Sequence, residues 1–228
     1  MIQQDPSTIR DWAEGMQDLN TTLISDALGR TGSLHEIVPL YRGARLVGPA
    51  FTVSCAPNDN LMCHYAVKMA RPGDVLVIAT GGYTSSSQWG ELLSLSASQR
   101  GIRGVVLDGC TRDRTRIETL SFPVFARGVI PQGTWKQTAG AVNEPVLCGG
   151  VTVCSGDLVI GDDDGVVVVP RGLVAEVLER ARELAAKENE IRRRILAGEL
   201  MYDFLNLCDA IPPAERITGG SNGNGGHG

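Results

Sequence analysis

The sequence has few of the residues that most often build metal and redox centres. It contains three histidines, and His35, His64 and His227 stand far apart in the chain. Its six cysteines form no CxxC pair, so neither a zinc site nor a disulfide-rich framework is indicated. We therefore expect reduced, mostly buried thiols and no histidine-based metal site.

Long hydrophobic runs and an excess of positive charge are also missing. No uninterrupted apolar segment has membrane-spanning length, and the first residues lack the basic and then apolar pattern of a signal peptide. The net charge is -5, and 43% of the residues are hydrophobic and 21% charged, which is typical of a globular protein and gives no general attraction to nucleic acid. These features predict a cytoplasmic protein that binds neither nucleic acid nor membranes.

What is present indicates one α/β domain. A length of 228 residues suits one larger domain. Two short helices are expected in the first 30 residues, because the helical spacing of apolar residues is interrupted near Asn20 and ends at Gly29. Residues 44–80 have a strand, helix, strand pattern, followed by a further helix and the strands VVLD and PVFARG. We predict a domain over residues 1–217 and a disordered Gly-rich tail over residues 218–228.

The region from residue 145 to 170 changes to closely spaced strands. Ser155-Gly156 and Asp164-Gly165 have the composition of hairpin turns, so this part of the sheet is expected to be antiparallel or mixed. The run Asp162-Asp163-Asp164 resembles the beginning of a calcium loop, but no glutamate follows at the required spacing, and a hairpin turn is the preferred interpretation. A long helix is predicted from about Leu173 to Leu196.

A Gly-rich and Ser-rich loop is expected in front of the helix that begins near Trp89-Gly90. Trp89, Leu92, Leu93 and Ala97 would share one apolar face of that helix. The free amides at a helix start can bind a carboxylate or phosphate. The alternative is that glycine and serine serve only turn and capping roles there.

Charged residues cluster around this helix and the next strand. Glu91 lies in the first helical turn, and the strand VVLD ends on Asp108-Gly109, before Arg112 and Asp113. The carboxyl ends of strands are where α/β proteins usually bind ligands. Glu91 can simply stabilise the helix dipole, and Arg112 can simply pair with Asp113. In the functional interpretation, Asp113 ligates a hard cation while Arg112 holds an oxyanion.

Two further residues allow more than one interpretation. Glu188 falls in the middle of the apolar stripe of the long helix, where a carboxylate needs a partner. That partner is either Arg192 or, if the stripe packs on another subunit, the metal site of that subunit. His64 lies on a predicted helix with Leu61 and Val67, and we interpret it as a packing residue.

The pattern GG…WGELL…G…VVLDG…RD, followed by GDDDGVVVVP, resembles the regulator of ribonuclease activity A family. That family includes 4-hydroxy-4-methyl-2-oxoglutarate / 4-carboxy-4-hydroxy-2-oxoadipate aldolase, a class II pyruvate aldolase that also decarboxylates oxaloacetate. The resemblance covers roughly Thr22 to Gly198. Its most specific element is an acidic residue, twenty intervening residues, and then Arg-Asp, met here by Glu91, Arg112 and Asp113. The ribonuclease-regulating branch typically has glycine in place of the acid.

The resemblance implies a role for each matching residue. Asp113 would bind Mg²⁺ or Mn²⁺ directly, and Glu91 would contact the metal through water. Arg112 would hold the pyruvyl group together with backbone around the helix start, at Gly90, Leu92 and Leu93. A glutamate of the C-terminal helix of a neighbouring subunit maps to Glu188.

The resemblance also implies a fold and an assembly. The expected fold is a single-domain α/β/β sandwich with mixed sheets and a long C-terminal helix, assembled into trimers or hexamers with the site at the subunit interface. Two departures from the family pattern bear on substrate and metal preference. Arg116 stands where the family often has an acidic residue, and Glu91 replaces the aspartate of the best-known aldolases.

The function implied is a divalent-metal lyase acting on a small-molecule 2-oxo diacid. It would cleave a 4-hydroxy-2-oxo acid by retro-aldol reaction to pyruvate, or decarboxylate oxaloacetate, through a metal-stabilised pyruvate enolate. No Schiff-base lysine is needed, and the three lysines, Lys68, Lys136 and Lys187, are expected to lie outside the cluster. The alternative is a non-catalytic regulator of an RNA-processing enzyme with the same fold.

Overall fold

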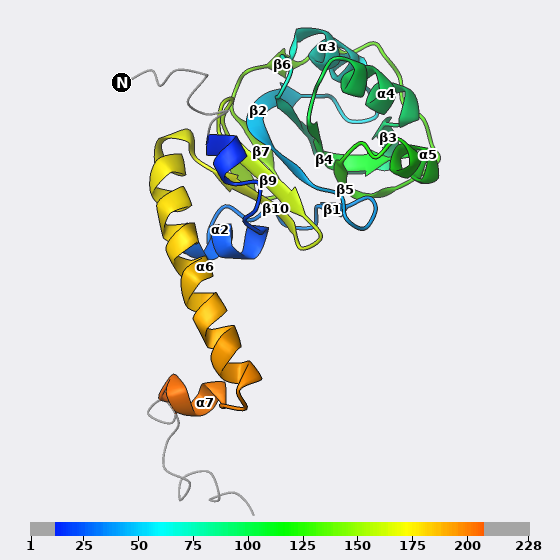
Figure 1. Ribbon diagram of the computed structural model, residues 1–228. Coiled ribbons are helices and arrows are strands. Elements are labelled where there is room, and N and C mark those ends of the chain that lie inside the picture. Colours follow the sequence, from blue (N-terminus) through cyan, green and yellow to red (C-terminus); the bar gives the residue numbers. More distant parts are fainter. Residues whose placement is uncertain (1–11, 208–228) are drawn as a thin grey trace, which may run out of the picture. The chain divides into compact units, whose positions relative to one another are not determined.

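The computed structural model describes residues 12–207, and the chain divides after Leu184 into two compact units (Figure 1). The first unit contains a mixed sheet in the order β1-β5-β4-β3-β2-β9-β10, with β6 beside β2. Strands β2 to β5 are parallel, and the remaining pairs are antiparallel. The strands are β1 (Val38–Pro39), β2 (Leu46–Ser54), β3 (Val75–Trp89), β4 (Gly104–Thr111), β5 (Val124–Val129), β6 (Ala141–Val142), β9 (Leu158–Asp162) and β10 (Gly165–Val169).

Both faces of the parallel strands are covered. Helices α3 (Leu61–Met69), α4 (Glu91–Gln99) and α5 (Arg114–Thr119) lie on one face, as Figure 1 shows. The opposite face packs against β9, β10 and the two-stranded sheet of β7 (Val146–Cys148) and β8 (Val151–Val153). Val105 and Leu107 of β4 enter the core under the helices, and Val106 enters the other core, as the alternation of side chains along a strand requires. The predicted α/β/β sandwich is confirmed.

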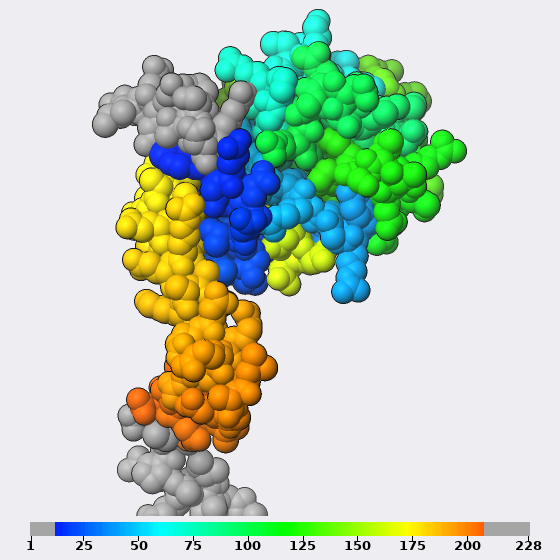
Figure 2. Space-filling model, in the orientation of Figure 1, coloured from blue at the N-terminus to red at the C-terminus, as the bar shows by residue number. Residues whose placement is uncertain are grey.

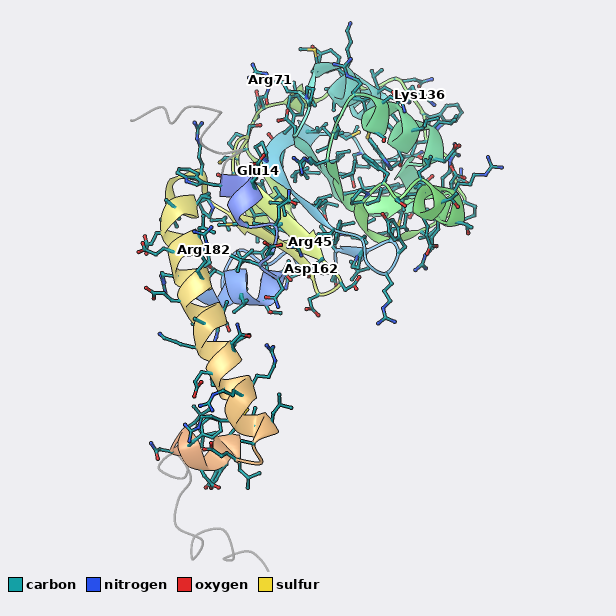
Figure 3. All side chains as sticks on the ribbon, viewed as in Figure 1. Glu14, Arg45, Arg71, Lys136, Asp162 and Arg182 are labelled. Atoms are coloured by element: carbon teal, nitrogen blue, oxygen red, sulfur yellow. The ribbon has the colours of Figure 1, made fainter. Side chains whose placement is uncertain are left out.

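The N-terminal region of the first unit forms two short helical segments, as predicted. Residues 12–15 are helical, and α2 (Thr21–Ala27) begins after Asn20, whose side chain accepts a hydrogen bond of 3.0 Å from the amide of Leu23. Helix α2, in the blue segment of Figure 2, lies against the strands β9 and β10. Arg45 donates to the carbonyl of Leu19 at 2.7 Å and lies 3.8 Å from Asp162 (Figure 3). Arg45 therefore connects the residues before α2 to strand β9.

Of the two predicted hairpin turns, one is confirmed and one is wrong. The Asp164-Gly165 turn joins the antiparallel strands β9 and β10, and Asp162 accepts the amide of Asp164 at 3.1 Å. Ser155-Gly156 does not join a hairpin, because β8 pairs with β7 while β9 pairs with β2 and β10. Turn composition showed that the chain reverses here but not which strand becomes the partner.

The end of the described chain is helical. A short 3-10 helix, η1 (Arg171–Leu173), leads into α6 (Val174–Leu196), and α7 (Met201–Phe204) follows. Within the first unit α6 buries Val174, Val177, Leu178 and Ala181. Within the second unit Arg194 pairs with Glu199 and lies 4.0 Å from the ring centre of Phe204. The predicted tail, residues 218–228, lies outside the described residues.

The helices and cysteines of the described residues agree with the composition of the chain. None of the helices in residues 12–207 is long and apolar enough to cross a membrane. The cysteines of this range are free thiols; Cys55, Cys63, Cys110 and Cys148 are buried and Cys154 is exposed. The predicted reduced, mostly buried thiols are confirmed for these five, and Cys208 lies outside the described part.

Candidate active site

A cavity of about 550 Å³ opens where β3 and β4 end and α4 and α5 begin. Six predicted site residues line it together: Gly90, Glu91, Leu92, Leu93, Arg112 and Asp113. The position at the carboxyl ends of parallel strands is where open α/β sheets usually bind ligands. The structure therefore brings together the residues that stand twenty or more positions apart in the sequence.

The strand leading into the cavity differs from the prediction. Residues 81–88, expected as a loop, continue β3 and pair irregularly with β4, at Tyr83 with Gly109 and at Trp89 with Thr111. Strand β4 correspondingly continues past Asp108-Gly109, where we predicted its end. Gly81 and Gly82, with φ of 70° and 75°, accommodate the irregular turn of the backbone. The loop predicted from composition is therefore wrong, because composition did not reveal the pairing with β4.

Asp113 begins α5 in the left-handed region, with φ 61° and ψ 35°, a conformation that aspartate adopts more readily than most residues. Its Oδ2 atom accepts a hydrogen bond of 3.2 Å from the amide of Glu91 and lies 3.5 Å from Nε of Arg112. The Arg112-Asp113 ion pair that the sequence left open is therefore present. Both side chains remain partly exposed, at 48% and 38%, so each can also contact a ligand.

The backbone of Gly90 is extended, with φ of -171°, and any residue could adopt that conformation. Glycine is therefore required here by close packing and not by its backbone angle. A Cβ atom at this position would lie 2.8 Å from Oδ2 of Asp113 and 3.2 Å from Cγ of Arg112. A side chain at residue 90 would therefore displace the two charged groups. Trp89 connects α4 to the segment that follows β4. Its indole donates to Ser94 at 2.8 Å, and its carbonyl accepts the amide of Arg112 at 3.1 Å.

The start of α4 presents free amide groups to the cavity. The amides of Leu92 and Leu93 donate to no residue in the range 12–207, and such amides bind anions together with the positive end of the helix dipole. Leu92 was predicted on the apolar face, but its side chain is 74% exposed, whereas Leu93 and Ala97 are buried. The buried face of α4 therefore differs from the predicted apolar face, and Leu92 lies at the rim of the cavity.

Asp59 holds the loop that closes the opposite side of the cavity. Its carboxylate is 3% exposed and accepts the amides of Leu61 at 2.8 Å, Gln137 at 2.7 Å and Thr138 at 3.1 Å. Burial acts to raise the pKa of Asp59, but these backbone donors outweigh it and bring the pKa below its ordinary value. The amide of Asn60 also donates to the carbonyl of Trp135 at 2.9 Å.

Replacing Asp59 with asparagine is expected to lower stability in a pH-dependent way. Because the folded-state pKa is depressed, the ionised carboxylate contributes stability above its ordinary pKa of about 4, and that contribution is lost as the pH falls through the folded value. Charged hydrogen bonds of this kind contribute about 1.5–3 kcal/mol each at most. Urea unfolding at several pH values should show the difference between wild type and Asp59→Asn largest at pH 7 and smaller below pH ~4.

The matched control for this prediction is Asp26→Asn, which removes an exposed carboxylate paired with Arg30. This control should change unfolding little at any pH. A difference between wild type and Asp59→Asn that stays constant from pH 7 to pH ~3 would show that the ionised carboxylate of Asp59 has no stabilising role.

Four of the cavity residues that were not predicted as site residues bear on its chemistry: Asn60, His64, Arg116 and Lys136. His64 is not the packing residue that we expected, because it is exposed on α3 and lines the cavity. The part of the His64 side chain that is covered lowers its pKa, and the nearby positive charge of Lys136 lowers it further. Lys136 lines the same cavity, so the expectation that it lies outside the cluster is wrong. The polar side of α3 was a usable signal for His64, whereas nothing in the sequence linked the loop of Lys136 to this site.

Asn60 carries a buried acceptor without a protein partner. Its Nδ2 donates to the carbonyl of Gln88 at 3.1 Å. Its Oδ1 has no hydrogen-bond partner within residues 12–207. A buried acceptor that is left unpaired costs about 1–3 kcal/mol.

Glu188 is the one predicted site residue that does not line this cavity. It is exposed on α6 in the second unit, and Arg192, its suggested partner, donates instead to Asn189 at 2.8 Å. The apolar stripe is buried only as far as Ala181, so the stripe does not bury Glu188 within one chain. A role for Glu188 in a neighbouring subunit stays a prediction.

The cavity offers two carboxylates, Glu91 and Asp113, that could hold a cation. Among residues 12–207 no group of three or more histidine, cysteine, aspartate or glutamate side chains is arranged to bind a metal ion. Mg²⁺ commonly uses one or two protein carboxylates and takes its remaining ligands from water and substrate. The donor set therefore fits a cation that is completed by its ligand and does not fit a closed structural site.

Comparison with known proteins identifies relatives of this chain. Residues 21–168 match the family described as RraA-like, Aldolase/RraA. The chain is 39% identical over 205 residues to a protein of Halalkalibacterium halodurans named "Putative 4-hydroxy-4-methyl-2-oxoglutarate aldolase", covering 90% of this chain and 97% of the relative. A similarly named protein of Shewanella oneidensis is 31% identical over 156 residues, covering 66% and 94%.

Solved structures extend the comparison. An uncharacterized protein from Pseudomonas syringae superimposes with a TM-score of 0.76 at 33% identity, covering 84% of this chain and 94% of its own. Streptomyces coelicolor RraAS2, described as an unusual member of the RNase ES inhibitor RraA family, gives a TM-score of 0.73 at 28% identity, covering 81% and 98%. With the family match spanning more than half of its length, the chain belongs to the RraA-like family of aldolases and RraA proteins.

Proposed function

We propose that this protein is a carbon-carbon lyase that releases pyruvate from a 4-hydroxy-2-oxo diacid by retro-aldol cleavage, and that it decarboxylates oxaloacetate in the same site. One observation carries the proposal. A single cavity joins the guanidinium of Arg112, the carboxylate of Asp113 and the free amides at the start of α4. Relatives named as aldolases support the same class of reaction.

Asp113 is the residue that we propose to hold Mg²⁺ or Mn²⁺, with Glu91 contacting the ion through water. The partly exposed carboxylate of Asp113 and its neighbour Glu91 supply the hard oxygen donors that such ions require. When bound, the cation supplies Lewis acidity that stabilises negative charge on the keto oxygen. The chain's own groups must do the remaining work of binding, orientation and proton transfer.

The proposed substrate lies with its keto acid end at α4. The amides of Leu92 and Leu93 would bind the C1 carboxylate, because they are unpaired at the positive end of the helix. The guanidinium of Arg112 would bind the oxygen that becomes negative when the bond between C3 and C4 breaks. Glu91 would orient the water that takes the proton from the C4 hydroxyl.

The alternative function is a non-catalytic regulator of an RNA-processing enzyme. RraAS2 has this fold and is described as a member of an RNase inhibitor family. The presence of Glu91 beside Asp113 in a charged cavity favours the lyase, because a docking surface has no chemical need for two carboxylates placed at an anion-binding helix start. The regulator remains the function to consider if the lyase test fails.

The test is pyruvate release by the metal-stripped protein with and without added Mg²⁺ or Mn²⁺. Substrates should include oxaloacetate and 4-hydroxy-4-methyl-2-oxoglutarate, with pyruvate detected through lactate dehydrogenase. We expect release that depends on the added ion. Release that needs no ion and is stopped by borohydride would instead indicate an imine formed on Lys136, the one lysine that lines the cavity. No release above the uncatalysed rate would contradict the lyase.

Glu188 is proposed to complete the site of a neighbouring subunit in a trimer or hexamer. Its exposed position on α6 leaves the carboxylate available to another chain. We expect Glu188→Ala to weaken activation by the metal by about 10- to 100-fold, as for other groups that support a bound ion from outside its direct ligands. Metal titration of pyruvate release measures this effect, and thermal unfolding should be unchanged.

The matched control is Glu183→Ala, another exposed glutamate of the same helix. Equal metal activation of wild type, Glu183→Ala and Glu188→Ala would remove Glu188 from the site. Light scattering of the same preparations gives the number of chains in the assembly, and a monomer with full activity would contradict the shared site.

A further inference from the structure

Two positive side chains of the cavity have no task in the reaction proposed above. Arg116 lies on α5, one turn after Asp113. Lys136 lies on the loop whose backbone amides donate hydrogen bonds to the carboxylate of Asp59. Neither side chain forms an ion pair with any residue in the described range 12–207. Both therefore present their full charge to whatever occupies the cavity.

The charges that line the cavity do not balance. Arg112, Arg116 and Lys136 are positive, whereas Glu91 and Asp113 are negative, so three positive charges face two negative ones before any cation is added. A bound divalent cation raises this net positive charge from one to three. The carboxylate of a pyruvyl group then lowers the net positive charge to two. The lowered pKa of His64, due to burial and then to Lys136, agrees with a positive potential on this wall.

The cavity also has more room than the keto acid end of a substrate needs. Its volume of about 550 Å³ lies within the range of pockets that bind whole metabolites or drug-sized ligands. Arg112 reaches the loop that carries Lys136, because a Cβ atom on Gly133 would lie 3.1 Å from Nη1 of Arg112. Arg116 comes from α5 and Lys136 from the loop after β5, and both line this cavity together with Arg112.

We propose that Arg116 and Lys136 form a second anion-binding side of the cavity, which binds the carboxylate at the end of the substrate farthest from the keto group. This inference rests on the proposed lyase function and assigns the residues that determine its specificity. Arg116 supplies a planar pair of donors for a carboxylate, and Lys136 supplies a point charge. The chain then selects 2-oxo diacids over 2-oxo monoacids of the same length.

Two substrates that differ only at the far end provide the test. Cleavage of 4-hydroxy-4-methyl-2-oxoglutarate gives two molecules of pyruvate, and cleavage of 4-hydroxy-4-methyl-2-oxopentanoate, which has a methyl group in place of the far carboxylate, gives pyruvate and acetone. We expect Arg116→Gln and Lys136→Met each to raise KM for the diacid about tenfold, as expected for loss of a charged hydrogen bond. KM for the monoacid and kcat for both should change less than about twofold.

The control variant is Arg114→Gln, which removes the same charge from the same helix at a residue that lines a different pocket. It should leave both KM values unchanged. Inhibition by oxalate, which reaches only the keto acid end, should be equal in wild type, Arg116→Gln and Lys136→Met. Arg116→Lys should restore part of the affinity for the diacid.

The outcomes separate the two levels of the proposal. An equal rise of KM for diacid and monoacid in both variants, or no rise for the diacid in the double variant, overturns the second anion site while the lyase stands. Wild-type protein that releases no pyruvate from either substrate overturns the lyase and this inference with it.

Discussion

Arg112→Lys is expected to lower kcat/KM for pyruvate release by about 100- to 1000-fold, which is the usual effect of removing one donor from a developing oxyanion. Lysine keeps the positive charge and loses the planar pair of donors. The position of the guanidinium is closely defined, with Nε 3.5 Å from Asp113 and the backbone amide bonded to the carbonyl of Trp89 at 3.1 Å. The flexible ammonium of a lysine has no equivalent fixed orientation.

Steady-state kinetics with 4-hydroxy-4-methyl-2-oxoglutarate and saturating Mg²⁺ measure this effect. Arg114→Lys is the control, because Arg114 begins α5, two residues after Arg112, and does not line the cavity. If Arg112→Lys and Arg114→Lys retained equal activity, the guanidinium of Arg112 would have no part in stabilising the enolate.

Asp113→Asn is expected to reduce metal-dependent pyruvate release by about 1000-fold or more, because the several kcal/mol supplied by a Lewis acid are lost with the ion that the carboxylate holds. Asparagine has nearly the same shape and also accepts the left-handed backbone, with φ of 61°, that residue 113 adopts. Its carbonyl oxygen can still accept the amide of Glu91. The fold at the start of α5 should therefore survive.

Circular dichroism and thermal unfolding of Asp113→Asn check that expectation, with activity measured over a wide range of Mn²⁺ concentration. Asp163→Asn is a suitable control, since Asp163 lies in the distant β9-β10 turn and accepts the amide of Gly43 at 2.7 Å. Full activity of Asp113→Asn at the same Mn²⁺ concentration as wild type would refute the assigned metal ligand.

Several elements were predictable because local chemistry determines them. The break between two short helices near Asn20, the Asp164-Gly165 hairpin and the long helix to Leu196 follow from apolar spacing and turn composition, and the structure confirms them. The proximity of Glu91 to Arg112 and Asp113 was also predictable. Both segments follow neighbouring parallel strands, so both must reach the same edge of the sheet.

Other features depended on contacts between distant segments. Residues 81–88 have a loop composition and yet form an irregular strand, because β4 supplies a pairing partner. Ser155-Gly156 has a hairpin composition and yet connects two sheets. Lys136 reaches the cavity through hydrogen bonds from its loop to Asp59, seventy-eight and seventy-nine positions away. No periodicity within one segment carries such information.

Glu188 shows the same limit for a helix. The spacing of apolar residues placed it correctly on the stripe of α6, but the stripe is buried only through Ala181 within one chain. Spacing identifies a face and does not identify what covers it. The oligomer therefore has to be measured directly.

The most direct test of the account is binding of Mn²⁺ by the wild-type protein, measured by electron paramagnetic resonance with and without oxalate, a planar mimic of the pyruvate enolate. We expect one bound Mn²⁺ per chain whose affinity rises when oxalate is present, no such binding in Asp113→Asn, and no rise with oxalate in Arg112→Met. Equal binding of Mn²⁺ by wild type and Asp113→Asn, or oxalate without effect on wild type, would contradict the central claim that Asp113, Arg112 and the start of α4 form one metal-assisted pyruvate site.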